Sequence, residues 1–341
     1  MLSHRPAAAA LAAALVMGAW ALAARVQQPP VQSPLPGAPL GIRGEAIYPA
    51  LEGWGPHKDG QTVIMIGYSS RNRDQTLDIP VGPNNRIEPG GPDYGQPTRF
   101  EPGRHYGVFA IAVPKDFGQK KLTWTLVANG QTATVQFWLN PPYWVDFFKN
   151  PATGNTPPVI RFAPGGPEWV GPPHRIAQTL TGTVGTPVPL RLWASDKPST
   201  YDPYEGLGGA AARGRGAGGR GRGVDPPAAR GDAPRDPPNF DLTAAAGRTG
   251  GGRPPRPSGP QPDITVTWKV HRGPGAVTFA DSVIRLDTKG DSNAVLEAST
   301  TGTFSQPGEY ILRAQVNDAT GDGGGGDLCC WTNAHVRVTV K

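Results

Sequence analysis

The stretch Pro307-Gly308-Glu309-Tyr310-Ile311-Leu312-Arg313-Ala314-Gln315-Val316-Asn317-Asp318 decides the fold of this chain. Apolar and polar side chains alternate along it, which predicts a strand with one buried face. The inward face is predicted to hold Tyr310, Leu312, Ala314 and Val316, and the other face Ile311, Arg313, Gln315 and Asn317. The same period of two recurs in residues 264–270, around Trp268, and in residues 334–340.

A tryptophan on one strand and a tyrosine at the corner of a later strand are typical of an immunoglobulin-like β-sandwich. The sequence therefore predicts an all-β protein, and its length suits two such sandwiches. In the second, spanning residues 156–341, the strands are expected at 188–194, 264–270, 276–279, 294–300, 310–317 and 332–340. We expect Trp268 and Tyr310 to meet in its core.

Three segments of this second domain carry a family resemblance: TWKVHRGPGAVTF at 267–279, TGTFSQPGEYILRAQVND at 301–318 and AHVRVTV at 334–340. Through them the chain resembles the PKD and Ig-like repeats of bacterial exported proteins. The resemblance implies a non-catalytic module used for adhesion, spacing, or carbohydrate and protein contact. The chain departs from antibody-type domains because Leu312 stands where they place a cysteine.

The first domain, residues 41–141, is predicted to have strands at 61–69, 75–79, 105–113, 121–127 and 132–139. Asn129-Gly130 separates the last two and predicts a tight hairpin, because both turn positions need positive φ. The polar segment 82–93 is predicted to be a loop, either a ligand-binding loop through Asn84, Asn85 and Glu88 or a structured crossover. Segments 67–100 and 113–132 resemble uncharacterised bacterial exported proteins, and this likeness implies no site residues.

The linker 142–155 overlaps the segment NPPYWVDFFKN at 140–150, which is dense in aromatic residues. Two interpretations are open. Tyr143, Trp144 and Phe147 form a platform that stacks on sugars or binds a partner, or the rings fill a seam between the two sandwiches.

Residues 1–24 are predicted to be a signal peptide, because a short basic start leads into an apolar run that ends in Ala21-Leu22-Ala23. An uncleaved membrane anchor is the alternative, and only then is a membrane a partner. Residues 25–40 are rich in proline and predict an extended tether. The protein is therefore expected to be exported, to the periplasm or the extracellular space.

An insertion at 197–262, rich in arginine, glycine and proline, interrupts the second domain and is predicted to be disordered, because it has almost no apolar residues to bury. The net charge of +6 is concentrated there and in scattered surface positions. Acidic residues nearby and the lack of interleaved aromatics disfavour nucleic acid as a partner. Two interpretations remain: the insertion is a sequence expansion that the fold tolerates, or it adheres weakly to acidic polymers or surfaces.

Four aspartates are predicted near one end of the second sandwich: Asp196, Asp318, Asp322 and Asp327. If they converge, they suit calcium, and the alternative is an ordinary solvated loop that binds no cation. No other cofactor is expected. Cys329 and Cys330 are adjacent at the same end, and three states are open for them: a strained vicinal disulfide, one buried and one free thiol, and an intermolecular bridge.

The six histidines form no metal-binding motif, and no G-x-S-x-G elbow or phosphate-binding loop occurs. We therefore expect no catalytic residues. The sequence favours an exported binding, adhesion or spacer protein of the bacterial cell envelope, whose partner is an envelope protein or polysaccharide. The alternatives are an accessory carbohydrate-binding protein and, behind it, a hydrolase with unidentified residues.

Overall fold

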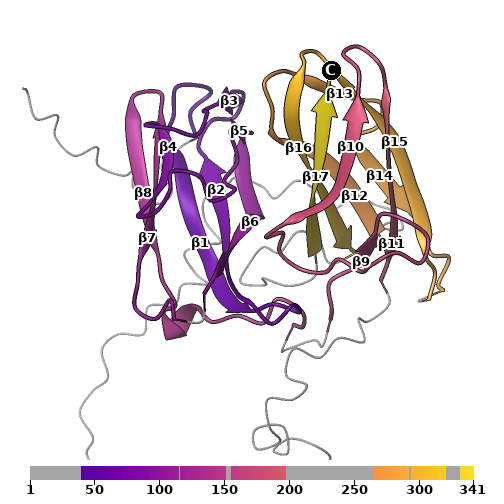
Figure 1. Ribbon diagram of the computed structural model, residues 1–341, viewed down its shortest axis with the longest axis horizontal. Coiled ribbons are helices and arrows are strands. Elements are labelled where there is room, and N and C mark those ends of the chain that lie inside the picture. The colour runs from indigo at the N-terminus through magenta and orange to yellow at the C-terminus, as the bar shows by residue number, and fades with distance from the viewer. Residues whose placement is uncertain (1–39, 115, 151–154, 197–263, 292, 320–330) are drawn as a thin grey trace, which may run out of the picture. The chain divides into compact units, whose positions relative to one another are not determined.

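Nearly all the regular secondary structure of the described residues is β-strand, as the sequence predicts (Figure 1). The computed structural model describes residues 40–114, 116–150, 155–196, 264–291, 293–319 and 331–341. Within these ranges the only helix is a single 3-10 turn, η1 (Pro141–Tyr143). Residues Pro39–Lys341 form one compact unit, and its strands make up two Ig-like β-sandwiches.

The first sandwich contains two three-stranded antiparallel sheets. One is β1 (Ile47–Pro56), β2 (Thr62–Ser70) and β6 (Gly103–Val113), and the other is β4 (Asn85–Glu88), β7 (Leu122–Ala128) and β8 (Gln131–Phe137). Two short strands, β3 (Leu77–Asp78) and β5 (Arg99–Phe100), form a separate antiparallel pair. Trp124 is fully buried in the core between the sheets and packs edge-on against Phe109, with 5.3 Å between ring centroids.

The second sandwich has a five-stranded and a four-stranded sheet. The larger runs in the order β10 (Ile176–Gly182), β17 (Trp331–Val340), β16 (Gly308–Asp318), β12 (Ile264–Arg272) and β14 (Val283–Leu286). The smaller runs β13 (Val277–Phe279), β15 (Leu296–Phe304), β11 (Val188–Ser195) and β9 (Val159–Arg161). The pair β10 and β17 is parallel, and the other pairs in both sheets are antiparallel.

Trp268 and Tyr310 are both buried in the core cluster of this sandwich, as predicted for the two rings. The Tyr310 hydroxyl donates a hydrogen bond of 2.8 Å to the main-chain carbonyl of Gln306, four residues upstream. This is the tyrosine corner expected of the Ig-like fold. Gly273 gives the ring its space, because a Cβ there would lie 2.2 Å from Tyr310 Cδ1.

Several predicted elements need correction. The segment predicted as a loop contains strand β4, because Ile87 and Asn85 both have buried side chains that fix the backbone there. The strand predicted at 75–79 is reduced to the two residues of β3. Strands β1, β5, β9, β10 and β14 were not predicted. The predicted signal peptide, tether and insertion lie outside the described residues.

A third apolar cluster joins residues of the two sandwiches through the linker. Phe147 and Phe148 are 2% and 5% exposed and pack with Val63 of β2, Val159 of β9 and Trp331 of β17. Their burial favours the seam interpretation of the aromatic linker for these two rings, since a buried aromatic side chain contributes about 1.5 to 3 kcal/mol.

Candidate functional site

The sheet of β12, β16 and β17 has its second face covered by polar contacts to the first sandwich. Asn333 and His335 of β17 are 3% and 6% exposed. The Asn333 amide donates to the carbonyl of Gly107 at 2.8 Å, and His335 Nε2 lies 3.1 Å from the carbonyl of Val108. Both acceptors belong to β6, so these two contacts tie β17 to the first sandwich.

The end of β12 is held by the segment that follows the 82–93 region. The Arg272 guanidinium donates two hydrogen bonds to the Asp93 carboxylate, at 2.9 and 2.7 Å, and a third to the Gln96 carbonyl at 2.6 Å. His271 Nε2 lies 2.8 Å from the Gly95 carbonyl. Lys269 pairs with Glu101 at 2.8 Å. Such bidentate, charge-assisted contacts fix orientation as well as adding stability.

A groove of about 230 Å³ opens beside these contacts. It is lined by residues of both sandwiches: Tyr94, Gly95, Phe109, Ala110, Pro173, His174, Arg175, Ile176, Arg272, Ile311, His335 and Arg337. Three arginines and the half-buried ring of Tyr94 in one groove suit an anionic group carried on a small ring or chain.

The three groove arginines differ in how far they are neutralised. Arg272 is paired with Asp93, and Arg337 lies 3.5 Å from the Glu309 carboxylate. The Arg175 guanidinium instead lies over the Trp169 ring, 4.8 Å from its centroid. Among the residues that the structure describes, no carboxylate lies within ion-pair distance of Arg175, so its charge is the one in the groove that is available to an anion.

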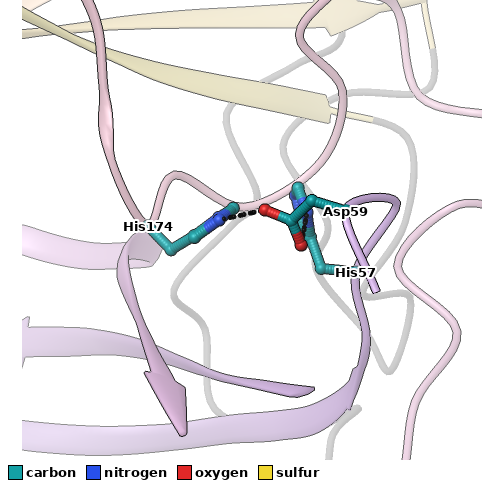
Figure 2. Close-up of side chains that lie close together, drawn as sticks. All are labelled: His57, Asp59 and His174. Atoms are coloured by element: carbon teal, nitrogen blue, oxygen red, sulfur yellow. Dashed lines mark hydrogen bonds and ion pairs between the residues drawn. The ribbon is translucent and has the colours of Figure 1, made fainter. Parts of the chain in front are cut away.

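A compact cluster of His57, Asp59 and His174 adjoins the groove (Figure 2). His174 Nε2 lies 2.7 Å from Asp59 Oδ2, and His57 Nδ1 lies 3.1 Å from Asp59 Oδ1. The two imidazole rings meet edge to face, with centroids 4.2 Å apart. The turn between β1 and β2 supplies His57 and Asp59, and the loop before β10 supplies His174.

Burial controls the charges of this cluster. It lowers the pKa of His57 to about 4, helped by the nearby His174 and opposed by the Asp59 carboxylate. Burial alone raises the pKa of Asp59, but the attraction of His57, the hydrogen bond from the Gln61 amide and the contact with His174 outweigh it, so the net pKa is lowered. At neutral pH the carboxylate is charged and the His57 ring is neutral.

The three residues predicted to form an aromatic platform differ in their exposure to solvent. Tyr143 and Trp144 are 46% and 44% exposed, at η1 and directly after it. Phe147 is 2% exposed, so its ring is not presented at the surface with the other two. A phenylalanine ring has no polar atom that favours contact with water, and this one packs in the apolar cluster at the junction.

The three candidate ligand contacts in the 82–93 segment also differ in their exposure to solvent. Asn84 is exposed, and Glu88 pairs with its neighbour Arg86 at 2.9 Å. Asn85 is fully buried. Its amide donates to the carbonyls of Ile79 and Pro97, and its oxygen accepts from Trp124 Nε1 at 2.9 Å. Asn85 therefore has a structural role in the core of the first sandwich.

The predicted calcium site and disulfide fall largely outside the described residues, since Asp322, Asp327, Cys329 and Cys330 lie there. Asp318 ends β16, is 6% exposed and accepts a hydrogen bond from Asn155 at 2.6 Å. Asp196 follows β11 directly. Neither belongs to a convergent group of three metal-ligating residues within the described ranges, where His57, Asp59 and His174 form such a group.

Sequence reasoning missed both the groove and the histidine cluster. His57 and His174 are separated by more than one hundred residues, so no short motif joins them. The H-x-D spacing of His57 and Asp59 was the single local signal of a metal-binding cluster. It indicates such a cluster only once the turn between β1 and β2 is known to bring both side chains together with His174.

Within the described residues no helix has the length and apolar character needed to cross a membrane. No protein-family model and no curated protein sequence matches the chain. Two solved structures resemble it weakly. The D00-D0 domain of intimin is 11% identical, with 87% of this chain and 100% of that chain covered and a TM-score of 0.23. A protein of unknown function from Porphyromonas gingivalis W83 is 6% identical, with 86% and 99% covered and a TM-score of 0.19. At these TM-scores neither neighbour bears on function.

Proposed function

We propose that this protein is an exported, non-catalytic binding module of the bacterial cell envelope, and that the groove at the sandwich junction holds an acidic polysaccharide. The observation that carries this proposal is the exposed Arg175 guanidinium, which lies in a groove with no described carboxylate to neutralise it. Export rests on the signal-like pattern of residues 1–24, and the adhesive role on the resemblance of the second domain to PKD and Ig-like repeats.

The groove suits a single anionic sugar unit of a longer chain. Its volume of about 230 Å³ is below the roughly 300 to 1,000 Å³ typical of sites that enclose a whole small molecule. Tyr94 offers an aromatic surface, and Arg175 offers a planar fork of donors that matches a carboxylate. The buried polar contacts on either side hold both walls, so little ordering is needed when a ligand binds.

The test is a binding screen with acidic and neutral glycans, followed by titration of those that bind. We expect binding of glycans that carry carboxylate groups, weakened about tenfold or more in Arg175→Ala, since a hydrogen bond to a charged group contributes about 1.5 to 3 kcal/mol. The matched control is Arg191→Ala, because Arg191 is an exposed arginine on β11, in the other sheet. Binding that is lost equally in both variants, or that is absent from the wild type, would contradict the proposal.

A second candidate is binding of neutral sugars by the exposed rings of Tyr143 and Trp144, which a specific observation favours. Large aromatic side chains that are nearly half exposed are unusual, and flat rings stack on sugar faces. In the same screen this candidate predicts binding of neutral glycans that Trp144→Ala abolishes and Arg175→Ala leaves unchanged.

A further inference from the structure

The cluster of His57, Asp59 and His174 has the composition and spacing of a metal centre, although no sequence motif marks it. One ligand atom from each residue lies within 4.8 Å of the others, and both imidazoles point toward the Asp59 carboxylate (Figure 2). We propose that these three residues bind a divalent transition-metal ion of the zinc class.

The donor set decides the class of ion. Two imidazole nitrogens and one carboxylate oxygen suit zinc and related borderline ions, whereas calcium requires six to eight oxygen ligands. Bonds of about 2.0 to 2.1 Å in a tetrahedron place neighbouring donor atoms about 3.4 Å apart. The present separations from Asp59, 2.7 Å to His174 and 3.1 Å to His57, are slightly shorter. Small side-chain movements therefore make room for the ion.

The ligands are held in place before any ion binds. The turn that carries His57 and Asp59 is closed by two main-chain hydrogen bonds, from His57 to the Gln61 carbonyl and from Gly60 to the His57 carbonyl. The Gln61 amide also donates to Asp59 Oδ1 at 3.2 Å. The His57 ring packs against Phe148, with 5.6 Å between centroids. Such supporting contacts raise metal affinity because they reduce the ordering that binding requires.

The donor atoms of the cluster have the chemistry that a metal requires. A carboxylate offers oxygen ligands, and an imidazole offers one nitrogen whenever the other carries its proton. Each ring places one nitrogen within 3.1 Å of the Asp59 carboxylate, so that nitrogen is the one that faces the proposed ion.

Three protein ligands leave a coordination position for a fourth. A cavity of about 10 Å³ is lined by His57, His174 and their neighbours, which is about the space that one water molecule occupies. Three protein ligands with a water at the fourth position is the arrangement of open zinc sites. Pro173, His174 and Arg175 line both this cavity and the groove, but the metal proposal does not depend on the groove having a ligand.

The experiment is calorimetric titration of the untagged, full exported chain with zinc chloride, after treatment with a chelator and removal of the chelator. We expect one equivalent of zinc to bind with a dissociation constant in the micromolar range or below, and the melting temperature to rise with zinc. Calcium chloride at the same concentrations should leave the melting temperature unchanged. The Co²⁺-loaded protein should show the intense visible absorption of a four-coordinate site.

Two variants locate the site. Asp59→Asn keeps the shape of a largely surface residue and removes its charge, and His174→Gln removes one imidazole. Each should weaken zinc binding at least tenfold, whereas Asp74→Asn, a change of an exposed aspartate in the same sandwich, should not. The double variant Cys329→Ser/Cys330→Ser should still bind zinc, which separates this site from the two thiols.

The proposal is overturned if the wild type binds no zinc at millimolar concentration, or if Asp59→Asn binds zinc as tightly as the wild type. Loss of binding only in the cysteine double variant also overturns it. Should His174→Gln fail to fold, Asp59→Asn and the cobalt spectrum of the wild type still decide the outcome. Failure here leaves the glycan-binding proposal standing, since that is tested with Arg175→Ala in the presence of a chelator.

Discussion

At the scale of single residues, two neighbouring asparagines have opposite roles. Asn85 is fully buried, and its side chain joins three groups: the carbonyls of Ile79 and Pro97 and the indole of Trp124. Asn84 is exposed. A polar segment rich in glycine and proline gives no sign of which asparagine turns inward, because the choice depends on partners from distant parts of the chain.

Replacing Asn85 by alanine should lower the free energy of unfolding by about 3 kcal/mol or more. The change removes three hydrogen bonds and leaves two carbonyls and an indole N–H buried without partners, each at a cost of about 1 to 3 kcal/mol. Asn84→Ala is the matched control and should change stability by less than about 0.5 kcal/mol. Chemical denaturation followed by tryptophan fluorescence measures both. Equal effects of the two changes would show that Asn85 is not a structural residue.

At the scale of elements, the β7–β8 hairpin is the part of the first sandwich that follows most directly from local sequence. Asn129 and Gly130 have φ values of 51° and 75°, as the predicted tight turn requires. The register pairs Leu122 with Phe137 and Leu126 with Ala133, so the apolar residues share one face. Strand β4, which pairs with β7, had no such local signal.

Gly130→Ala should destabilise the protein by about 1 kcal/mol through backbone strain alone. A Cβ at this position meets nothing within 4 Å, so no steric clash contributes, while a left-handed conformation costs an L-residue about 1 to 2 kcal/mol. Thr134→Ala, an exposed change in the same hairpin, is the control and should be close to neutral. Thermal melts of the three proteins provide the measurement, and a variant as stable as the wild type would count against a strained turn.

At the scale of the whole molecule, three histidines make the junction of the sandwiches sensitive to acid. Burial, helped by the positive charge of Arg313, lowers the pKa of His335 to about 3 and that of His105 to about 4. Burial, followed by the neighbouring His335, lowers the pKa of His271 as well. The ring centroids of His271 and His335 lie 4.2 Å apart, and Nε2 of each ring lies within hydrogen-bond distance of a main-chain carbonyl.

The free energy of unfolding should therefore fall as the pH decreases from about 6.5 to 4.5. Each histidine has a folded-state pKa below the ordinary value of 6.5, so protons bind the unfolded chain preferentially, and the stabilisation is complete only above pH 6.5. The lowered pKa values of Glu101 and Asp93 act in the same direction, but only below the ordinary values of 4.5 and 3.8 for these carboxyls. Two further groups act above pH 4.5: burial lowers the pKa of His57 to about 4, which adds to the fall, and burial raises the pKa of Glu52, which opposes it. A variant of a single histidine therefore isolates the contribution of that residue.

His335→Gln should reduce this slope by up to about 1.4 kcal/mol per pH unit, the contribution of one proton. Denaturation curves at several pH values, recorded with a chelator so that no metal contributes, give the slopes. Asn84→Ala changes no ionisable group and should keep the wild-type slope. An unchanged slope in His335→Gln would mean that His335 is not held neutral at the junction.

Sequence alone determined that this chain folds as Ig-like β-sandwiches, and it placed the core tyrosine and tryptophan of the second one. That was possible because alternation of apolar and polar residues is a local property, and so is the turn at Asn129-Gly130. Only the tertiary structure decided which polar residues are buried at the junction, that Arg175 stands in a groove, and that His57, Asp59 and His174 meet. These features arise from contacts between segments that lie far apart in the chain, and no pattern within a single segment encodes them.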